Sequence, residues 1–283
     1  MSVSPWYYLL VLVEAPLLYW LAWMGGWPYF LLIAVVAMMG MSELYSHLVV
    51  KGARPDVGVG CVCGLLVLAA GEFTPLQVWP VVAVGVLLLT MAGSLCAQFT
   101  RTGRGDTVRD AALTALGVLY VALPMSFFFL LCKLDIPLLV DGHSAGRAKA
   151  RLGALLVVTL SVWLCDTAAW AVGHLIGRVK LVPRLSPNKT VEGAVAGGIA
   201  AVVATTLLGT WAGLPIHHGI VLGLLIAVGA QLGDLAESVI KRDLGLKDFG
   251  TVVGPHGGML DTFDSLLFAA PLTWFYLWLA LTP

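Results

Sequence analysis

Long apolar runs recur along this chain, and their length is the strongest restriction on its fold. A helix needs about 20 mainly apolar residues to cross a bilayer, because each residue adds about 1.5 Å across a core of about 30 Å. Hydrophobic residues make up 59% of the 283 residues and charged ones 11%, too little charge to cover a soluble core of this size. We therefore predict an all-α, polytopic membrane protein. Nine candidate spans are 7–24, 28–50, 57–71, 76–98, 108–131, 152–177, 190–212, 219–240 and 264–282.

Basic residues collect at alternate ends of these spans. Twelve of the sixteen lysines and arginines follow the second, fourth, sixth and eighth spans, and the other four lie in the connection 132–151. Because cytoplasmic loops carry an excess of Lys and Arg, we expect the even-numbered ends in the cytoplasm and the C-terminus outside the cell membrane. The first basic residue is Lys51, so we expect no cleavable leader. A formal net charge of zero gives no case for nucleic-acid binding.

The two parts of the chain differ in their polar content. Residues 1–110 carry few distinctive polar groups, and we interpret them as transmembrane helices for packing, dimerisation or lipid contact. Glu43 lies within one of these spans and receives no catalytic assignment. Residues 111–283 contain glycine pairs with GxxxG spacing, which let helix backbones approach closely in lipid. We predict that this second part is a catalytic half with a site facing the cytoplasm. The pairs are Gly193 and Gly197, Gly219 and Gly223, and Gly229 and Gly233.

Acidic residues gather at the end of the eighth span and the start of the ninth. Asp261 and Asp264 stand one helical turn apart at the entrance to the ninth span. Carboxylates converging from two helices are typical of a Mg²⁺ site that also takes up substrate phosphate. Asp166, deep in the sixth span, needs a partner too, and this site is the natural candidate. Asp234 could instead form a structural pair with a lysine. One face of the eighth span carries Asp234, Glu237, Ser238 and Lys241.

Two neighbouring segments supply groups that bind phosphate. Hydroxyls and an ammonium group before the seventh span could hold phosphate oxygens at a helix N-terminus, although the pattern is also that of a capped helix start. Paired glycines before the ninth span allow the backbone to wrap phosphate. We expect these groups on one cytoplasmic face, where they predict binding of a polyphosphate together with a divalent ion. Because the site would open beside lipid, we expect the second substrate to be amphipathic. The segments contain Ser186, Lys189 and Thr190, then Lys247 and Asp248, then His256, Gly257 and Gly258.

These residues together resemble the signature of the phosphatidate cytidylyltransferases, also called CDP-diacylglycerol synthases. The family pattern S-x-x-K-R, K-D, H-G-G and D-R-x-D is matched at the same spacing. Upstream, the family segments G-D-x-x-E-S and D…S-P-x-K-T-x-E-G are matched as well. The resemblance covers residues 110–282, and the first hundred residues match only in hydrophobicity. The matching segments are Ser238–Arg242, Lys247–Asp248, His256–Gly258, Asp261–Asp264, Gly233–Ser238, and Asp166 with Ser186–Gly193.

The resemblance implies an integral membrane enzyme, usually a homodimer, that condenses CTP with phosphatidic acid to CDP-diacylglycerol and pyrophosphate. It also implies a centre of Mg²⁺ with a second cation such as K⁺, held by Asp234 and Asp261, to which we add Asp166 as a metal ligand. We assign catalytic roles to Asp234, Asp261, Lys241 and Asp264. Assigned to substrate binding are Ser186, Lys189, Thr190, Ser238, Arg242, Lys247, Asp248, His256, Gly257 and Gly258.

One departure from the signature keeps other functions open. Thr262 stands where the family has Arg, which removes a fork of hydrogen-bond donors beside the aspartates. The chain could therefore be a catalytically silent paralogue, or one that acts on another lipid phosphate. An ion-coupled transporter using Asp166, Asp234 and Asp261 as relay carboxylates is a third hypothesis. The two halves show no convincing internal repeat, which counts against transport.

Overall fold

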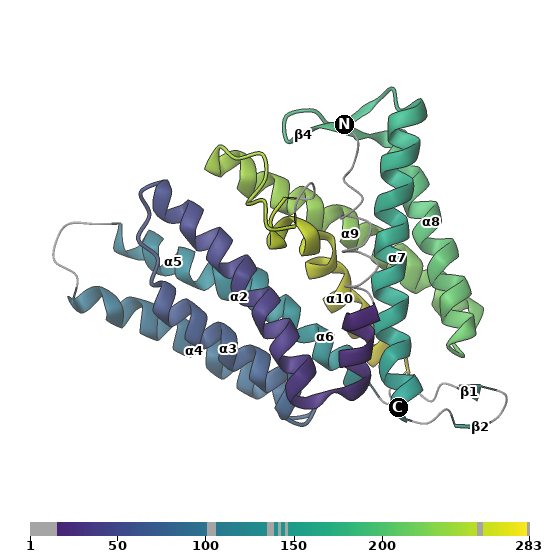
Figure 1. Ribbon diagram of the computed structural model, residues 1–283, viewed down its shortest axis with the longest axis horizontal. Helices are drawn as coiled ribbons and strands as arrows, with labels where there is room; N and C mark the ends of the chain where they lie inside the picture. Colours follow the sequence, from purple (N-terminus) through teal and green to yellow (C-terminus); the bar gives the residue numbers. More distant parts are fainter. Residues whose placement is uncertain are drawn as a thin grey trace. The chain divides into compact units, whose positions relative to one another are not determined.

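The protein is built almost entirely of α-helices in its computed structural model (Figure 1). The structure describes residues 16–100, 106–134, 139–140, 143–144, 147–253 and 257–281. The predicted all-α class is confirmed. Residues 16–24 are helical, and the helices that follow are α2 (Gly26–Val50), α3 (Val57–Phe73), α4 (Trp79–Ala97), α5 (Thr107–Gly117), α6 (Leu123–Lys133), α7 (Arg147–Ile176), α8 (Val191–Trp211), α9 (Ile216–Leu244) and α10 (Met259–Leu281).

Short elements interrupt or connect these helices. A 3₁₀ turn, Gln98–Thr100, follows α4, and a π-helical segment, Val118–Ala122, joins α5 to α6. Two small antiparallel hairpins complete the secondary structure. They are β1 (Leu139–Val140) with β2 (His143–Ser144), and β3 (Lys180–Val182) with β4 (Ser186–Thr190).

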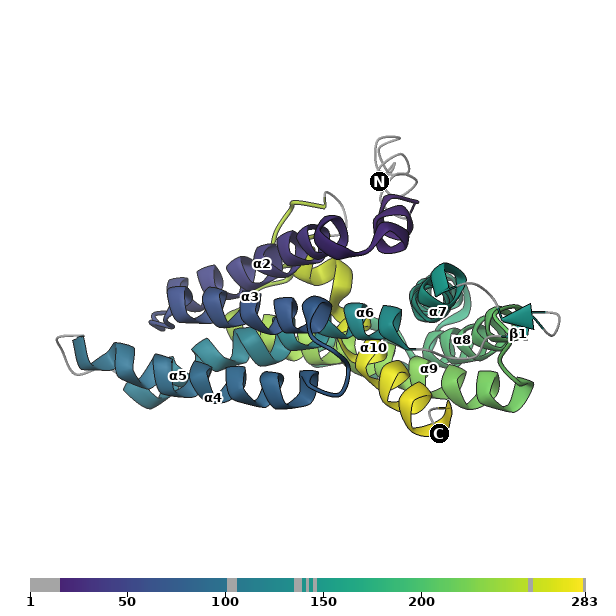
Figure 2. The same cartoon turned by 90° about the horizontal axis from the view of Figure 1, so that it is seen from below.

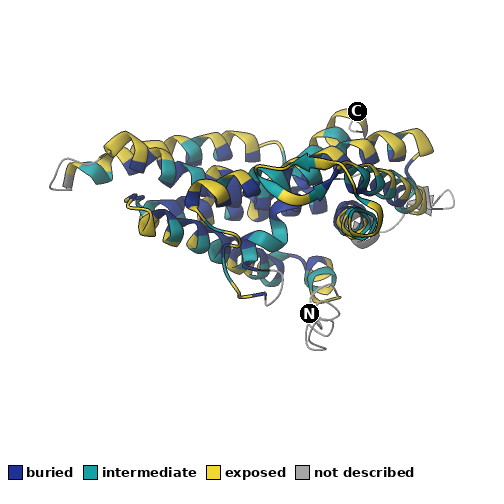
Figure 3. Ribbon diagram, turned by 90° about the horizontal axis from the view of Figure 1, so that it is seen from above, coloured by how far each residue is buried: buried dark blue, intermediate teal, exposed yellow. Residues whose placement is uncertain are grey.

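Seven helical segments in the described part of the chain are long and apolar enough to cross a membrane. They correspond to predicted spans two, four, five, six, seven, eight and nine. The third, α3, is apolar but only 17 residues long. The first, 7–24, lies partly outside the described residues, so the count of nine stays a prediction. Exposed positions recur along the helices in Figure 3. Among them are large apolar side chains such as Val81, Val84 and Leu88 of α4, as contact with lipid requires. The chain is an integral membrane protein.

Internal contacts divide the chain into two compact units. One comprises Met1–Leu130 with Leu244–Thr262, and the other Leu131–Asp243 with Phe263–Pro283. Helix α10 therefore begins in the first unit and continues in the second. The predicted division at residue 110 into a packing part and a catalytic part concerns roles rather than contacts, and it stays a prediction.

The first unit packs around α2, which lies beside α3 (Figure 2). Its largest buried side chains include Tyr29, Met41 and Tyr45. The Tyr45 hydroxyl donates a hydrogen bond of 2.7 Å to the carbonyl oxygen of Thr114, which links α2 to α5. This buried bond gives the aromatic ring a polar partner in an otherwise apolar interior.

The second unit is held together by glycines at helix contacts. A Cβ atom added to Gly197 of α8 would lie 2.8 Å from the carbonyl oxygen of Cys165 in α7. A Cβ atom on Gly223 of α9 would lie 2.6 Å from the Cα atom of Val202 in α8. These distances are shorter than real side-chain contacts, so only glycine permits the observed approach. The predicted packing role of the GxxxG pairs is confirmed at these positions.

Candidate active site

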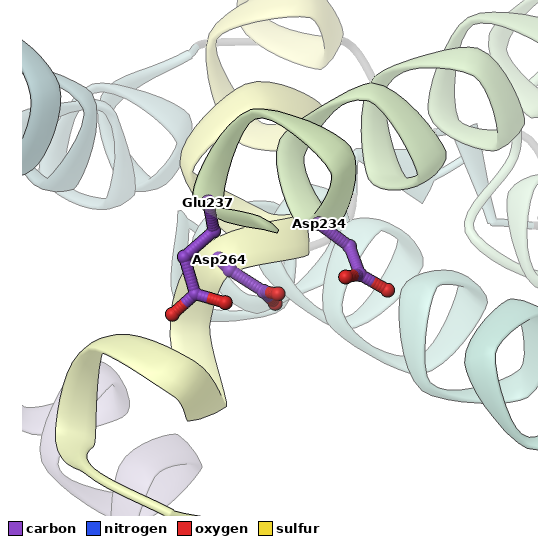
Figure 4. A group of neighbouring side chains, drawn as sticks. All are labelled: Asp234, Glu237 and Asp264. Atoms are coloured by element: carbon purple, nitrogen blue, oxygen red, sulfur yellow. The ribbon is translucent and has the colours of Figure 1, made fainter. Parts of the chain in front are cut away.

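Three carboxyl groups converge in the second unit (Figure 4). Asp234 and Glu237 lie one turn apart on α9, and Asp264 lies on α10 between them in this view. One ligand oxygen from each residue lies within 4.8 Å of the other two. Glu237 is fully buried and Asp264 is 8% exposed. We call these three residues the acidic cluster.

A glycine on α9 allows the two helices to bring these groups together. At Gly233 the α10 backbone comes so close that a Cβ atom would overlap the carbonyl oxygen of Asp264 and lie 3.1 Å from the Cα atom of Ser265. One turn earlier, a Cβ atom on Gly229 would lie 3.2 Å from the Cα atom of Ala269. Gly229 and Gly233 of this GxxxG pair therefore set how closely α9 and α10 approach, and with it the separation of the acidic residues.

Two lysines balance much of the negative charge of the acidic cluster. The Lys189 ammonium forms an ion pair with Asp234, and the Lys241 ammonium forms one with Glu237 a turn away on the same helix. Glu237 is fully buried, and an unpaired charge in such a place is strongly unfavourable. The predicted alternative for Asp234, a pair with a lysine, is thus present in this structure. It does not exclude a metal role, because a carboxylate can exchange its partner.

The donor set of the acidic cluster is compatible with a divalent cation. Its carboxylate oxygens are the hard ligands that Mg²⁺ prefers, and Mg²⁺ usually adds water and substrate phosphate to one or two protein carboxylates. Asp234, with a side chain 33% exposed, borders an open cavity, whereas Glu237 and Asp264 are enclosed. An ion held here would therefore be reached by a substrate from the side of Asp234.

The cavity beside Asp234 has a volume of about 630 Å³, within the range of small-molecule sites. We call it the polar cavity. Its wall combines residues of α7, the β3–β4 hairpin, α8 and α9. Two lysines, two aspartates and neutral donors meet there, which suits an anionic ligand accompanied by a cation. The polar side chains include Asp166, Lys180, Asn188, Lys189, Thr190, Gln231 and Asp234.

The start of α8 faces the polar cavity. Thr190 caps the helix, because its hydroxyl oxygen accepts a 3.2 Å hydrogen bond from the backbone N–H of Gly193. Both residues line the cavity. The partial positive charge of a helix N-terminus favours phosphate at this place. The sequence allowed two roles for this segment, phosphate binding or capping of the helix. The structure shows the cap, and it lies at the wall of the polar cavity.

Asp261 lies in the first unit, where it organises the loop before α10. Its Oδ2 accepts hydrogen bonds from the backbone N–H groups of Phe249 at 2.8 Å and Gly258 at 2.6 Å. Gly257 has a φ of +94°, and a Cβ atom there would lie 2.5 Å from Oδ2 of Asp261. The predicted need for glycine in this turn is confirmed. The assignment of Asp261 as a metal ligand stays a prediction.

The other predicted residues take varied positions. Ser238 is buried beside the acidic cluster on α9, and Lys247 and Asp248 are exposed. Arg242 is exposed, and its Nε donates a 2.9 Å hydrogen bond to the carbonyl oxygen of Leu185 in the β3–β4 turn. Ser186 pairs with Val182 across the hairpin and does not line the polar cavity. His256 lies outside the described residues.

Sequence reasoning assigned no role to two residues that the structure makes prominent. Glu237 could have been found, because it stands three residues after Asp234 on the same helical face. Glu43 gave no such signal. Its carboxylate oxygens accept hydrogen bonds of 2.9 Å from the N–H groups of Met259 and Leu260, more than two hundred residues away.

The sequence model of the Cytidylyltransferase family matches residues 8–280. The chain belongs to this family. The match extends through the first hundred residues, so the expectation that the likeness begins near residue 110 was too narrow. Membership of the cytidylyltransferase family confirms the resemblance drawn from the motifs.

Several curated relatives share most of the chain's length, and all three described here are called phosphatidate cytidylyltransferase. The protein from Synechocystis sp. is 30% identical over 275 residues, which cover 91% of each chain. The protein from Staphylococcus aureus strain COL is 30% identical over 252 residues, and that from Staphylococcus haemolyticus is 29% identical over 256 residues. Each of these two alignments covers 88% of this chain and 89% of the relative.

Proposed function

We propose that this protein is a phosphatidate cytidylyltransferase, which transfers the cytidylyl group of CTP to phosphatidic acid. A phosphate oxygen of the lipid forms a bond to the α-phosphorus of CTP. The bond between the α-phosphorus and the oxygen that joins it to the β-phosphorus breaks, and pyrophosphate leaves. CDP-diacylglycerol remains in the membrane. The observation that carries the proposal is the polar cavity with lysines and a helix N-terminus next to the acidic cluster, in a chain of the cytidylyltransferase family.

Residues of the polar cavity would bind and orient the nucleotide. Lys189, Lys180 and the N-terminus of α8 would hold phosphate oxygens. Lys189 would then leave Asp234, which frees this carboxylate for a cation. The acidic cluster, Asp166 and Asp261 would hold Mg²⁺, with a second cation such as K⁺ nearby. A divalent ion bound there would neutralise charge on the phosphates during the transfer.

The remaining assigned residues complete the proposed site. Lys241, buried beside Glu237, would stabilise charge that develops on the transferred phosphate. The residues that would contact the substrates are Ser238, Arg242, Lys247, Asp248, His256, Gly257 and Gly258. We place the site on the cytoplasmic side of the cell membrane, where CTP is available, and we propose a homodimer as the working form.

The decisive experiment supplies purified protein in lipid nanodiscs with CTP, phosphatidic acid and MgCl₂. We expect CDP-diacylglycerol and pyrophosphate in equal amounts, and no product when EDTA removes the divalent ion. Asp264→Asn should lower the turnover roughly 100-fold or more, because a lost electrostatic contribution of about 3 kcal/mol is a factor of this size. Asp234→Asn tests the same cluster at a less buried position.

Asp243→Asn is the matched control for both variants. Asp243 is exposed and lies near the end of α9, outside the acidic cluster and the polar cavity. We expect this control to keep the activity of the wild-type protein. Full activity of Asp264→Asn and Asp234→Asn would refute the assignment of the acidic cluster. Equal activity with and without EDTA would refute the divalent ion.

Thr262 favours one alternative, a paralogue that is silent or that uses another lipid phosphate. Its hydroxyl donates a 3.0 Å hydrogen bond to the carbonyl oxygen of Gly258, the residue just before its own helix α10. In the same assay, product from a different lipid phosphate but none from phosphatidic acid would identify an altered acceptor. CTP binding without product from any lipid, with activity gained in Thr262→Arg, would identify a silent paralogue.

A further inference from the structure

An apolar groove runs along the outer side of α8 and α9 and ends at the polar cavity. It has a volume of about 630 Å³ and is lined almost only by carbon atoms. Its two rims are rows of exposed aliphatic residues spaced four apart, each 50% to 60% exposed. The rims are Val195, Ile199 and Val203 on α8, and Leu224, Val228 and Leu232 on α9.

The groove exists because α8 and α9 separate along their length. The helices meet at regular four-residue steps, from Gly223 against Val202 to Ala227 against Gly198. At the first step a Cβ atom on Gly223 would lie 2.6 Å from the Val202 backbone. At the second step a Cβ atom on Gly198 finds no atom nearer than 3.9 Å. At this second step the floor of the groove is therefore made of two small residues, Gly198 and Ala227, with room for an added Cβ.

The groove and the polar cavity share two lining residues, Leu181 and Gln231. Gln231 stands between them, because its Nε2 donates a 3.0 Å hydrogen bond to the carbonyl oxygen of Ala194 across the two helices. On one side of Gln231 lie Asp234 and Lys189, and on the other side lies the apolar groove. A ligand that occupies both places must have an anionic end and an apolar end.

The length of the groove matches one leaflet of a bilayer. From Leu224 to Leu235 it follows α9 for eleven residues, or about 16 Å at 1.5 Å per residue. Half of a hydrocarbon core of about 30 Å is about 15 Å. An acyl chain of a lipid in that leaflet would therefore lie along the whole groove while its headgroup reaches the polar cavity.

We infer that this groove binds an acyl chain of the lipid phosphate substrate and thereby positions its phosphate at Gln231, beside Asp234. The inference rests on the proposed function and adds the place of the lipid substrate to it. Gly198 is the sensitive position, because its missing side chain leaves the floor open. An added Cβ there would make only ordinary van der Waals contacts, so we expect a leucine at this position to extend into the groove.

The first test compares Gly198→Leu with the wild-type protein on dioleoyl and dihexanoyl phosphatidic acid. We expect the KM for the dioleoyl lipid to rise about tenfold, as for other blocked apolar subsites. The KM for the dihexanoyl lipid should change less than twofold, and so should the KM for CTP. Gly85→Leu is the control, because Gly85 on α4 has no atom within 4 Å of an added Cβ and does not line the groove. An equal change for both lipids, or a change in the oligomeric state of Gly198→Leu, would overturn the inference.

A second test does not depend on turnover. Phosphatidic acid with a diazirine in its acyl chain should label peptides of α8 and α9 around the groove, and Gly198→Leu should lose this labelling. Equal labelling by the phosphatidylcholine analogue would show an ordinary lipid-facing surface and overturn the inference. If the wild-type protein makes CDP-diacylglycerol but the groove variants behave like it, the inference fails and the proposed function stands. If the lipid labels the groove but the protein makes no product, the proposed function fails and the groove stands as a binding site for the lipid.

Discussion

Lys189 connects the two chemical features of the site. Its ammonium pairs with Asp234 of the acidic cluster, and the same side chain lines the polar cavity. The side chain is 25% exposed, so it is accessible to a ligand in the cavity. A polyphosphate would compete with one carboxylate for this ammonium, and charge-assisted hydrogen bonds to phosphate are strong. Binding of nucleotide and release of Asp234 are thereby coupled through one residue.

Replacing Lys189 should weaken nucleotide binding more than it weakens the fold. We expect Lys189→Met to raise the KM for CTP about tenfold or more, because a charge-assisted hydrogen bond contributes about 1.5–3 kcal/mol. Steady-state kinetics at varied CTP concentration measure this change. Arg184→Met is the control, since Arg184 is exposed in the β3–β4 turn and does not line the polar cavity. A KM that matches the wild-type value would remove Lys189 from the nucleotide site.

Neighbouring glycines of α8 illustrate how one helix serves two purposes. Gly197 faces α7, where a Cβ atom would lie 2.9 Å from the Cβ of Ala169. Gly198 faces the groove and has no close neighbour. The sequence shows two adjacent glycines, and GxxxG spacing identifies only the first as a packing residue. The open position of the second depends on how far α9 diverges, which no local pattern records.

This pair gives a matched test of helix packing. Gly197→Ala should destabilise the protein by about 1–3 kcal/mol, because an overpacked contact forces the α7 and α8 backbones apart. Gly198→Ala should be neutral or slightly stabilising, because alanine favours helix by up to about 1 kcal/mol over glycine. Thermal melting of both variants in the same detergent measures the difference. Equal melting temperatures would contradict the close contact between α7 and α8.

Glu43 fixes the beginning of α10 from another helix. Both of its carboxylate oxygens accept backbone N–H groups of the first turn of α10. The variant Glu43→Ala removes the carboxylate and leaves the two N–H groups without this acceptor. We expect the free energy of unfolding to fall by about 1–3 kcal/mol. Asp106→Ala is the control, because its side chain is 74% exposed and its ion pair with Arg109 contributes little. A melting temperature for Glu43→Ala equal to that of the control would contradict the capping role.

The beginnings of elements were harder to predict than their existence. Helix α8 was expected at 190–212 and is observed at Val191–Trp211, because its apolar run and its cap at Thr190 are both local. Helix α10 begins at Met259 rather than at residue 264, since its first turn depends on the distant Glu43. Strand β4 lies in the connection between the predicted sixth and seventh spans, where no strand was predicted, and it forms by pairing with β3. Local patterns identify an element, whereas distant partners decide where it starts.

At the scale of the whole molecule, composition and motif spacing predicted the class of protein and its family. Apolar runs require a membrane, and seven helical segments of the described chain meet that requirement. The site residues themselves stay a prediction. Ion pairs or the acidic cluster bring together Asp234, Asp264, Lys189 and Lys241. The groove was not predicted. It arises from the way α8 and α9 separate, and no residue type in the sequence indicates that separation.

The orientation in the membrane is the remaining property of the whole molecule that charge alone predicts. Twelve of the sixteen basic residues follow even-numbered spans, which places the β3–β4 hairpin in the cytoplasm and the α8–α9 connection outside. Arg184 is exposed in the β3–β4 turn that precedes α8, and His217 is exposed at the start of α9. Cysteines at these two positions should therefore react on opposite sides of the membrane.

Background labelling is avoided by replacing Cys61 and Cys96, because the other three cysteines are buried. In intact cells, a membrane-impermeant maleimide should label His217→Cys and spare Arg184→Cys. In inside-out vesicles the labelling should reverse, since the reagent then meets the cytoplasmic face. Labelling of Arg184→Cys in intact cells would place the polar cavity on the side of the membrane that lacks CTP. That result would contradict both the topology and the supply of nucleotide to the proposed site.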